Sequence, residues 1–130
     1  MGSVVALAGQ VGGAKLAEGL YRLRGEGLTV IVNTGDDYEH LGLAFSPDID
    51  TMLYTLAGIA AASAGWEPEN ESHAVHGMVR TLGGPDRPVH GDRSLAAPLL
   101  RAEGLGNERR LTDITLDFAG TSVSARACCR

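Results

Sequence analysis

Apolar residues form two short runs near the start of the chain, with a stretch of helical spacing between them. Residues 3–8 make the first run and are followed by a glycine-rich segment at 9–13, after which leucine and alanine recur at helical spacing over 14–23. Residues 28–32 are β-branched and apolar on both faces, which is typical of a strand buried in a parallel sheet. This order predicts a βαβ unit.

Helical patterns dominate the remainder of the chain. Ser46-Pro47 has the form of an N-cap followed by proline at the first helical position, and the apolar stripe that follows predicts a helix to about residue 64. Trp66 is then expected to close the end of this helix. Further helices are predicted over the segments 74–82, 94–101 with an interruption at Pro98, and 111–118. We therefore predict an α/β fold of the Rossmann-like, three-layer type with a parallel sheet.

Length and charge narrow the class of protein. A chain of 130 residues with 44% hydrophobic content suffices for one domain or part of one. The net charge is −5 and Lys15 is the only lysine, so the sequence has no basic stripe for nucleic acid. No apolar stretch reaches the roughly 20 residues of a membrane span. Cys128 and Cys129 are adjacent and not at metal-ligand spacing, and we expect a protein of the reducing cytoplasm.

The glycine-rich segment after the first predicted strand is a candidate phosphate site. Gly9, Gly12 and Gly13 would let backbone N–H groups approach a phosphate at the positive end of the following helix. The segment lacks the Gly-Lys-Ser/Thr of a P-loop, and Val11 departs from the dinucleotide fingerprint. The alternative is a turn eased by glycine with no ligand. Lys15, one turn into the helix, is expected to be solvated.

Acidic residues gather where the second predicted strand ends and the long helix begins. Asp36 and Asp37 follow the strand, and Asp48 and Asp50 lie in the first turn of the helix. Carboxylates brought together favour a hard cation such as Mg²⁺, although loop formation and helix capping are the simpler roles of aspartate. Residues two apart on a helix point about 200° away from each other. We therefore expect Asp48 to cap the helix and Asp50 to project into the crevice outside the strand ends.

Basic and histidine side chains give weaker signals. In Gly91-Asp92-Arg93, the Arg93 guanidinium could bind an anion through two hydrogen bonds, while Asp92 caps the following helix or orients Arg93. An ordinary surface ion pair fits the same spacing equally well. The four histidines do not have the spacing of a metal set and are expected to face solvent. They are His40, His73, His76 and His90.

Taken together, these segments resemble the 2-phospho-L-lactate transferase family of coenzyme F-420 biosynthesis. The matching segments are Val5-Ala6-Leu7-Ala8-Gly9, Val11-Gly12-Gly13-Ala14-Lys15-Leu16, Val32-Asn33-Thr34-Gly35-Asp36-Asp37, Ser46-Pro47-Asp48-Ile49-Asp50-Thr51 with Leu53-Tyr54, Gly65-Trp66 and Gly91-Asp92-Arg93. The similarity is strong over 4–66, weaker over 67–101 and lost over 102–130. It implies the N-terminal half of the family fold.

The resemblance also implies a reaction and roles for particular residues. The family moves a phospho-acid, phospholactate or phosphoenolpyruvate, from a guanosine diphosphate ester to the ribityl hydroxyl of 7,8-didemethyl-8-hydroxy-5-deazariboflavin, and it releases GMP with Mg²⁺ assistance. By this resemblance Asp50 and Asp37 are the expected catalytic residues, and Asp36, Asp37 and Asp50 the expected Mg²⁺ ligands. The expected nucleotide-binding residues are Gly9, Gly12, Gly13, Asn33, Thr34 and Arg93. The partners would be small molecules, and the resemblance leaves open whether the protein forms a homodimer.

Two departures from the family pattern leave alternatives open. Gln10 stands where the family usually has glycine, and Ser94 replaces an acidic residue. The alternatives are a non-catalytic nucleotide-sugar-binding protein of the gluconeogenesis-factor type and an inactive truncated fragment.

Overall fold

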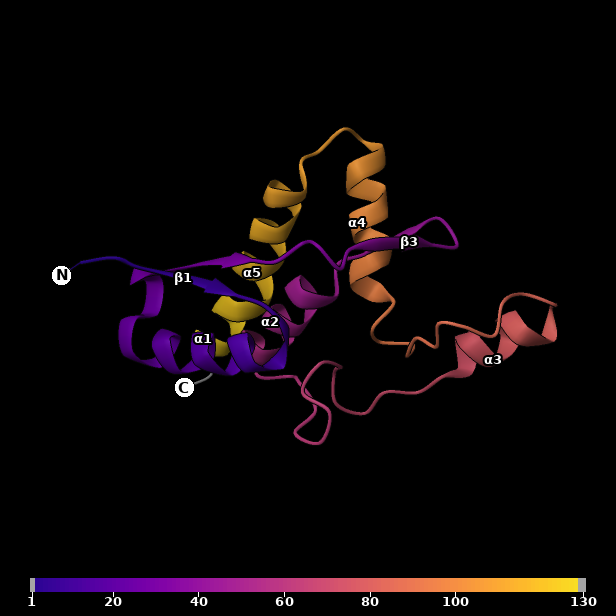
Figure 1. Ribbon diagram of the computed structural model, residues 1–130, viewed down its shortest axis with the longest axis horizontal. Helices are drawn as coiled ribbons and strands as arrows, with labels where there is room; N and C mark the ends of the chain where they lie inside the picture. Colours follow the sequence, from indigo (N-terminus) through magenta and orange to yellow (C-terminus); the bar gives the residue numbers. More distant parts are fainter. Residues whose placement is uncertain (1, 129–130) are drawn as a thin grey trace.

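The N-terminal third of the chain forms a βαβ unit. The computed structural model describes residues 2–128, with side chains described as far as residue 123. Strand β1 (Val4–Ala8), helix α1 (Gln10–Arg24), a 3-10 turn (Gly25–Gly27) and strand β2 (Leu28–Val32) follow one another. The two strands pair in parallel with Ala6 opposite Val30, and α1 packs along one face of the pair (Figure 1). The predicted βαβ unit is confirmed.

Helix α1 begins earlier than predicted. Its first residue is Gln10 rather than Ala14, so Gly12 and Gly13 lie in its first turn and Gly9 alone is the N-cap. A Cβ on Gly13 would lie 3.0 Å from the Cβ of Ala8, which shows that this glycine lets the helix approach the strand closely. The glycine-rich segment is therefore mainly a packing feature, and the turn between β1 and α1 is a single residue long.

A β-hairpin that the sequence pattern did not predict follows β2. Strand β3 (Tyr38–His40) pairs antiparallel with strand β4 (Leu43–Phe45), with Tyr38 opposite Phe45. The two turn residues, Leu41 and Gly42, both have positive φ, 51° and 75°. This is the requirement of a type I′ hairpin turn, which Asn-Gly usually fills. Leucine at the first turn position removed the usual sequence signal.

Helix α2 (Pro47–Ala57) is the central helix of the structure. Pro47 occupies its first turn as predicted, but Gly58 ends it in the left-handed conformation at φ 73°, several residues before the predicted end. Ile49, Met52 and Leu53 are buried on it, and Met52 packs with the fully buried Ala14 and Ala17 of α1. The predicted apolar stripe is thus the contact between α2 and the βαβ unit.

Three further helices complete the described chain. They are α3 (Ala74–Thr81), α4 (Ala96–Gly106) and α5 (Leu111–Cys128). Pro98 does not interrupt α4, because it lies in the first turn, where backbone N–H groups have no partner inside the helix. Helix α5 packs against α2 and extends well beyond the predicted 111–118, whereas α3 projects away from the other helices (Figure 1). Cys129 and the side chain of Cys128 lie outside the described residues.

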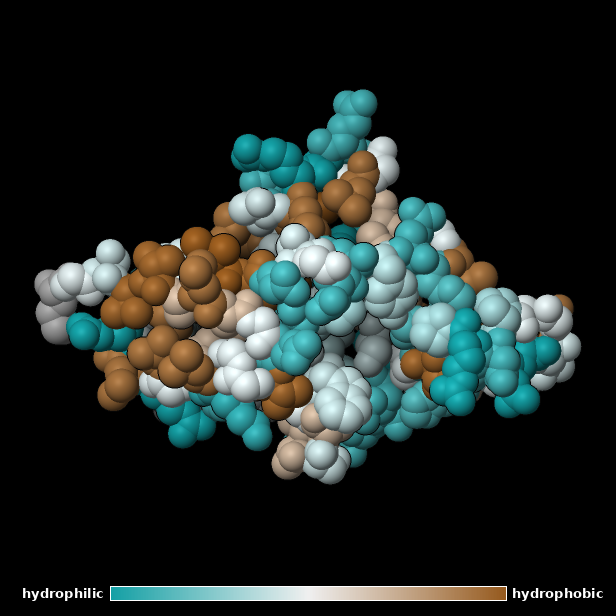
Figure 2. Space-filling model, in the orientation of Figure 1, coloured by the Kyte–Doolittle hydropathy of each residue, from teal (hydrophilic) through white to brown (hydrophobic). Residues whose placement is uncertain are grey.

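The two-stranded parallel sheet is covered on one face. Ala6 is buried and Val30 and Val32 pack against the core, but Leu7 is 78% exposed and Ile31 is 55% exposed. The prediction that 28–32 is buried on both faces is therefore wrong for Thr29 and Ile31, which are exposed. Figure 2 shows hydrophobic side chains gathered over the region of β1. The fold is α/β, a partial Rossmann-like arrangement, and no helix within residues 2–128 has the length and apolar character to cross a membrane.

Candidate functional site

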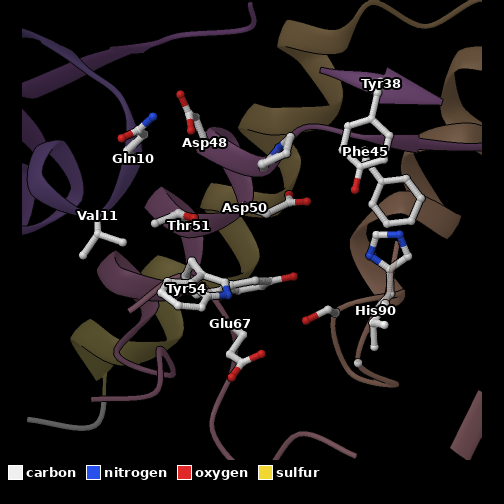
Figure 3. Close-up of a pocket in the computed structure, with 15 residues that line it drawn as sticks. Gln10, Val11, Tyr38, Phe45, Asp48, Asp50, Thr51, Tyr54, Glu67 and His90 are labelled. Atoms are coloured by element: carbon white, nitrogen blue, oxygen red, sulfur yellow. The ribbon is translucent and has the colours of Figure 1, made fainter. Parts of the chain in front are cut away.

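A pocket of about 380 Å³ opens beside the N-terminal ends of α1 and α2. It lies between the turn after β1, the first turns of α2, the β-hairpin, and the segments around Trp66 and His90 (Figure 3). Its lining residues are Gln10, Val11, Tyr38, Phe45, Pro47, Asp48, Asp50, Thr51, Tyr54, Trp66, Glu67, Val89, His90, Gly91 and Ser94. The location agrees with the crevice outside the carboxyl ends of parallel strands that the sequence predicted.

One wall of the pocket is a stack of rings. Phe45 stacks on Tyr38 and on His90, with centroid distances of 5.0 and 4.1 Å and interplanar angles of 5° and 18°, and the Tyr38 and His90 centroids lie 6.3 Å apart (Figure 3). The hairpin supplies the rings of Tyr38 and Phe45. The prediction that the histidines face solvent is wrong for His90, whose Nε2 is buried without a hydrogen-bond partner, and for His76, whose side chain is 14% exposed. Burial, together with His40 and His76, lowers the pKa of His90.

Two further aromatic residues line the pocket from α2 and the loop after it. Tyr54 comes from α2, and Trp66, which is 61% exposed, comes from the loop. Trp66 does not close the end of α2, because the helix ends at Ala57. Burial, with the charge of Asp50 as a smaller cause, strongly raises the pKa of Tyr54, so its hydroxyl is a hydrogen-bond donor at neutral pH. The pocket thus has aromatic surface on more than one side.

Asp48, at the start of α2, contacts the turn after β1 and the residue that follows β2. Its Oδ2 accepts a hydrogen bond of 2.9 Å from the Nδ2 of Asn33, and a Cβ on Gly9 would lie 3.0 Å from the same oxygen. The Oδ1 of Asn33 in turn accepts from the backbone N–H of Gly35 at 3.1 Å. The prediction that Asp48 caps its own helix is therefore wrong. It joins α2 to the end of β2, and the absence of a side chain at Gly9 makes room for it.

Asp50 lies between the Asp48 side of the pocket and the ring stack (Figure 3). It is buried, 7% exposed, and forms an ion pair with Arg101 of α4, which is 1% exposed. Nη2 of Arg101 donates to Oδ1, and Nη1 donates to Oδ2 at 3.3 Å and to the carbonyl oxygen of Ala44 at 2.9 Å. Burial raises the pKa of Asp50, and the Arg101 guanidinium acts in the opposite direction. Asp50 faces the crevice as predicted, but with a bound cationic partner.

The carboxylates of Asp36 and Asp37 differ in their surroundings. Asp37 accepts a hydrogen bond of 2.8 Å from Ser46 Oγ on Oδ2, while its Oδ1 is buried without a partner. Asp36 is exposed, and its Oδ2 lies 3.5 Å from the Nδ2 of Asn33. Ser46, the N-cap residue of α2, therefore directs its hydroxyl to Asp37 rather than to its own helix.

The described residues contain no group of three or more His, Cys, Asp or Glu side chains arranged to hold a metal. Mg²⁺ usually keeps several waters and is bound through one or two carboxylates together with substrate phosphates. The unpartnered Oδ1 of Asp37 fits that mode, whereas Asp50 is already paired with Arg101. The residues therefore fit a metal shared with a substrate better than a metal held by protein alone.

Arg93 does not line this pocket, although Gly91 and Ser94 on either side of it do. Its guanidinium donates to the carbonyl oxygen of Glu69 and lines a separate apolar cavity between α2, α4 and α5. Its neighbours form a structural turn. The Glu71 carboxylate accepts from the backbone N–H groups of Arg93 and Ser94 at 2.6 and 3.0 Å. A Cβ on Gly91 would overlap the Glu71 side chain, so the Gly91-Asp92-Arg93 segment serves to join two loops.

Of the predicted site residues, Asp50 lines the pocket, as does Asp48. Gly9 and Asn33 lie against Asp48, and Asp37 accepts from Ser46, but these three do not line the pocket. Gly12 and Gly13 lie in α1, Thr34 and Asp36 are exposed, and Arg93 lies elsewhere. Sequence reasoning missed Arg101 and the ring stack. The rings require the unpredicted hairpin, and an arginine in a helix of ordinary pattern gives no sign of being buried.

Comparison with known proteins gives a consistent family. The family model described as 2-phospho-L-lactate transferase CofD matches residues 4–107. A phosphoenolpyruvate transferase of Kitasatospora aureofaciens is 38% identical over 115 residues, which cover 86% of this chain and 36% of the relative. One of Mycobacterium tuberculosis is 38% identical over 127 residues, covering 86% of this chain and 38% of the relative. The chain thus spans little more than a third of the length of these curated relatives.

Proposed function

We propose that this chain, which belongs to the 2-phospho-L-lactate transferase family, forms the acceptor-binding part of a transferase of coenzyme F-420 biosynthesis. The proposed acceptor is 7,8-didemethyl-8-hydroxy-5-deazariboflavin, and the proposed donor is a guanosine diphosphate ester of lactate or enolpyruvate. In the reaction a ribityl hydroxyl oxygen bonds to the phosphorus that carries the acid. The bond from that phosphorus to the bridging oxygen breaks, and GMP leaves.

The observation that carries the proposal is a pocket whose lining combines aromatic rings with carboxylates. Its volume of about 380 Å³ is in the range of small-molecule sites. The parallel rings of Tyr38, Phe45 and His90 offer flat surface to a tricyclic ligand, since stacked aromatic pairs stabilise by about 0.5–1.5 kcal/mol beyond area burial. A deazaflavin ring would lie against these rings, with its ribityl chain directed to Asp48 and Asp50.

Asp50 is the proposed group that orients the reacting hydroxyl and accepts its proton. Burial raises the pKa of Asp50, which makes the carboxylate a stronger base, and a general base works best when its pKa approaches the operating pH. Each of its oxygens retains a lone pair beyond those used by Arg101. Asp48 is the proposed second acceptor for ribityl hydroxyls, since it lines the same pocket.

The donor diphosphate is proposed to lie at the edge of the pocket nearest Gly9 and Asp37. The acidic side chains that line the pocket are Asp48, Asp50 and Glu67, so a diphosphate entering it needs a cation. Mg²⁺, when bound, would neutralise charge on the diphosphate, and Asp37 is the residue proposed to hold it through its free oxygen. The first-turn N–H groups of α1, beside Gly9, would donate to phosphate oxygens.

Binding and turnover test the proposal separately. Deazariboflavin fluorescence, titrated with the chain, should change on binding, and Phe45→Leu should weaken binding roughly tenfold because it removes the ring that stacks most closely on both Tyr38 and His90. Leu41→Ala, on the exposed hairpin turn, is the matched control and should bind normally. Wild-type chain that leaves the fluorescence unchanged at saturating concentration would exclude the acceptor pocket.

Turnover is measured by mass analysis after incubation with the deazariboflavin, Mg²⁺ and guanylated donor. The expected products are the phospho-acid ester of the deazariboflavin and GMP, and Asp50→Asn should abolish them. Binding without product formation would assign this chain the acceptor site alone. Stabilisation of the fold by GMP or GDP, without deazariboflavin binding, would instead favour a nucleotide-binding protein.

A further inference from the structure

We infer that Arg101 is the positioning residue for Asp50, holding that carboxylate and the strand that carries Phe45 in one arrangement toward the ligand. The inference rests on the proposed function only for the identity of that ligand. Arg101 lies on α4, far along the chain from Asp50 on α2 and from Ala44 on β4. Its guanidinium contacts both of the latter, so a single side chain joins three elements.

Burial separates a positioning role from a catalytic one. Arg101 is 1% exposed and does not line the pocket, so it has no surface to offer a substrate. Asp50, which Arg101 contacts, and Phe45, which follows the contacted Ala44, both line the pocket. The guanidinium carbon lies 5.9 Å from the ring centre of Phe118 on α5. Arg101 therefore acts on the pocket through the groups it holds.

The geometry of the pair fixes the direction of the carboxylate. Both terminal nitrogens of Arg101 donate to Asp50, one to each oxygen, and this two-point contact prevents rotation of the carboxylate. The same Nη1 donates to the Ala44 carbonyl, next to Phe45 in β4. An ammonium group has no planar fork and cannot reproduce this arrangement.

A purely stabilising role explains the pair poorly. Two charges removed from water carry a desolvation cost that their attraction often fails to offset, and apolar residues of similar volume frequently serve as well or better. Nε of Arg101 is in addition buried without a partner. A pair that is costly to bury, and whose carboxylate lines a pocket, is better explained by orientation of that carboxylate.

The first test needs no ligand. In a guanidinium locked on a carboxylate, rotation about its C–N bonds is slow, so the Nη protons of Arg101 should give separate NMR resonances in the wild-type chain. Asp50→Asn should merge them. Averaged Nη resonances in the wild type would overturn the inference.

The second test is a double-mutant cycle in deazariboflavin binding. Arg101→Met should weaken binding roughly tenfold in the wild-type background and clearly less when Asp50→Asn is present, because only its contact with Ala44, next to Phe45, then remains to be lost. Arg101→Lys should restore part of the affinity. Arg22→Met, which breaks the exposed pair with Glu18, is the control and should bind as the wild type. Additive losses across the cycle would contradict positioning.

Folding and function failures are distinguishable in this design. If Arg101→Met alone fails to fold, Arg101→Lys and the double variant Arg101→Met/Asp50→Asn, which leave no buried carboxylate without a cation, carry the comparison. The double variant must then bind less than tenfold more weakly than Asp50→Asn, and the lysine variant more weakly than the wild type; any other order overturns the inference. Separate Nη resonances in a wild-type chain that binds no deazariboflavin would support the positioning of Asp50 and overturn the proposed function.

Discussion

At the scale of single residues, the two neighbouring glycines of α1 have opposite roles. A Cβ on Gly13 would meet the Cβ and backbone of Ala8 at 3.0–3.3 Å, whereas a Cβ on Gly12 would have no neighbour within 4 Å. We predict that Gly13→Ala lowers the free energy of unfolding by about 1–3 kcal/mol through overpacking against a rigid strand. Gly12→Ala should raise it by roughly 0.5–1 kcal/mol through helix propensity. Urea denaturation measures both. A loss of stability in both variants would show that Gly12 also serves the turn.

A second residue-scale prediction concerns pH and His90. Burial, with His40 and His76 nearby, lowers the pKa of His90 in the folded state, so the unfolded chain binds the proton more readily. Stability therefore rises with pH through this group, and it should be lost as the pH falls below the ordinary histidine value of about 6.5. His90→Phe keeps a ring on Phe45 and should remove this component of the pH dependence.

The control for the pH experiment is Leu23→Ala, which shortens a side chain on α1 that is 80% exposed and changes no titratable group. It should leave the pH dependence of the unfolding midpoint between about pH 5 and 7 unchanged. If the wild-type midpoint does not vary in this range, or if His90→Phe varies as the wild type does, His90 does not set the pH response.

At the scale of elements, α3 depends on a carboxylate from a distant segment. Asp92 accepts hydrogen bonds from Ser72 Oγ at 2.7 Å and from the backbone N–H groups of Ala74 and Val75 at 3.0 and 2.9 Å. These bonds satisfy the free donors at the start of the helix, as a capping residue would. We predict that Asp92→Ala speeds amide hydrogen exchange throughout α3 while the amides of α1 keep their rates.

The same contact has a pH signature. The hydrogen bond from Ser72, and then those from the backbone, lower the pKa of Asp92. The stabilisation of α3 is thus fully present above the ordinary carboxyl value and is lost as the pH falls through the lowered folded-state value. Asp113→Ala, at the start of α5, is the control for exchange in α3. Unchanged α3 exchange in Asp92→Ala would show that other contacts hold this helix.

Elements whose signal is local were predictable, and those that depend on a partner were not. The apolar run of β1, the apolar face of α2 and Pro47 each carry their own pattern, and these elements are present. The hairpin was missed because Leu41 adopts a positive φ that leucine rarely takes. Likewise Asp48 was misjudged as a cap because its partner, Asn33, lies in another element. The candidate site was predicted where strand ends defined it and missed where Arg101 completes it.

At the scale of the whole molecule, the sheet has a bare apolar face. Val5, Leu7 and Ile31 are 60%, 78% and 55% exposed on adjacent parallel strands, on the side away from α1 and α2. In parallel sheets of α/β proteins both faces are normally covered. The 130-residue chain alone therefore presents a surface of the kind that drives association.

We predict that this chain self-associates through the bare sheet face, in keeping with the homodimer that the sequence analysis left open. Burying one leucine or isoleucine side chain stabilises by about 1.5–3 kcal/mol, so Leu7→Thr with Ile31→Thr should weaken the association roughly tenfold or more. Threonine is β-branched, which suits a strand. Sedimentation velocity over a range of protein concentrations measures the shift.

Leu82→Thr removes an equally exposed leucine, 80% exposed, next to α3, and should leave the association intact. A wild-type chain that stays monomeric at every concentration, or a control that dissociates as readily as the sheet variant, would place the association elsewhere or exclude it.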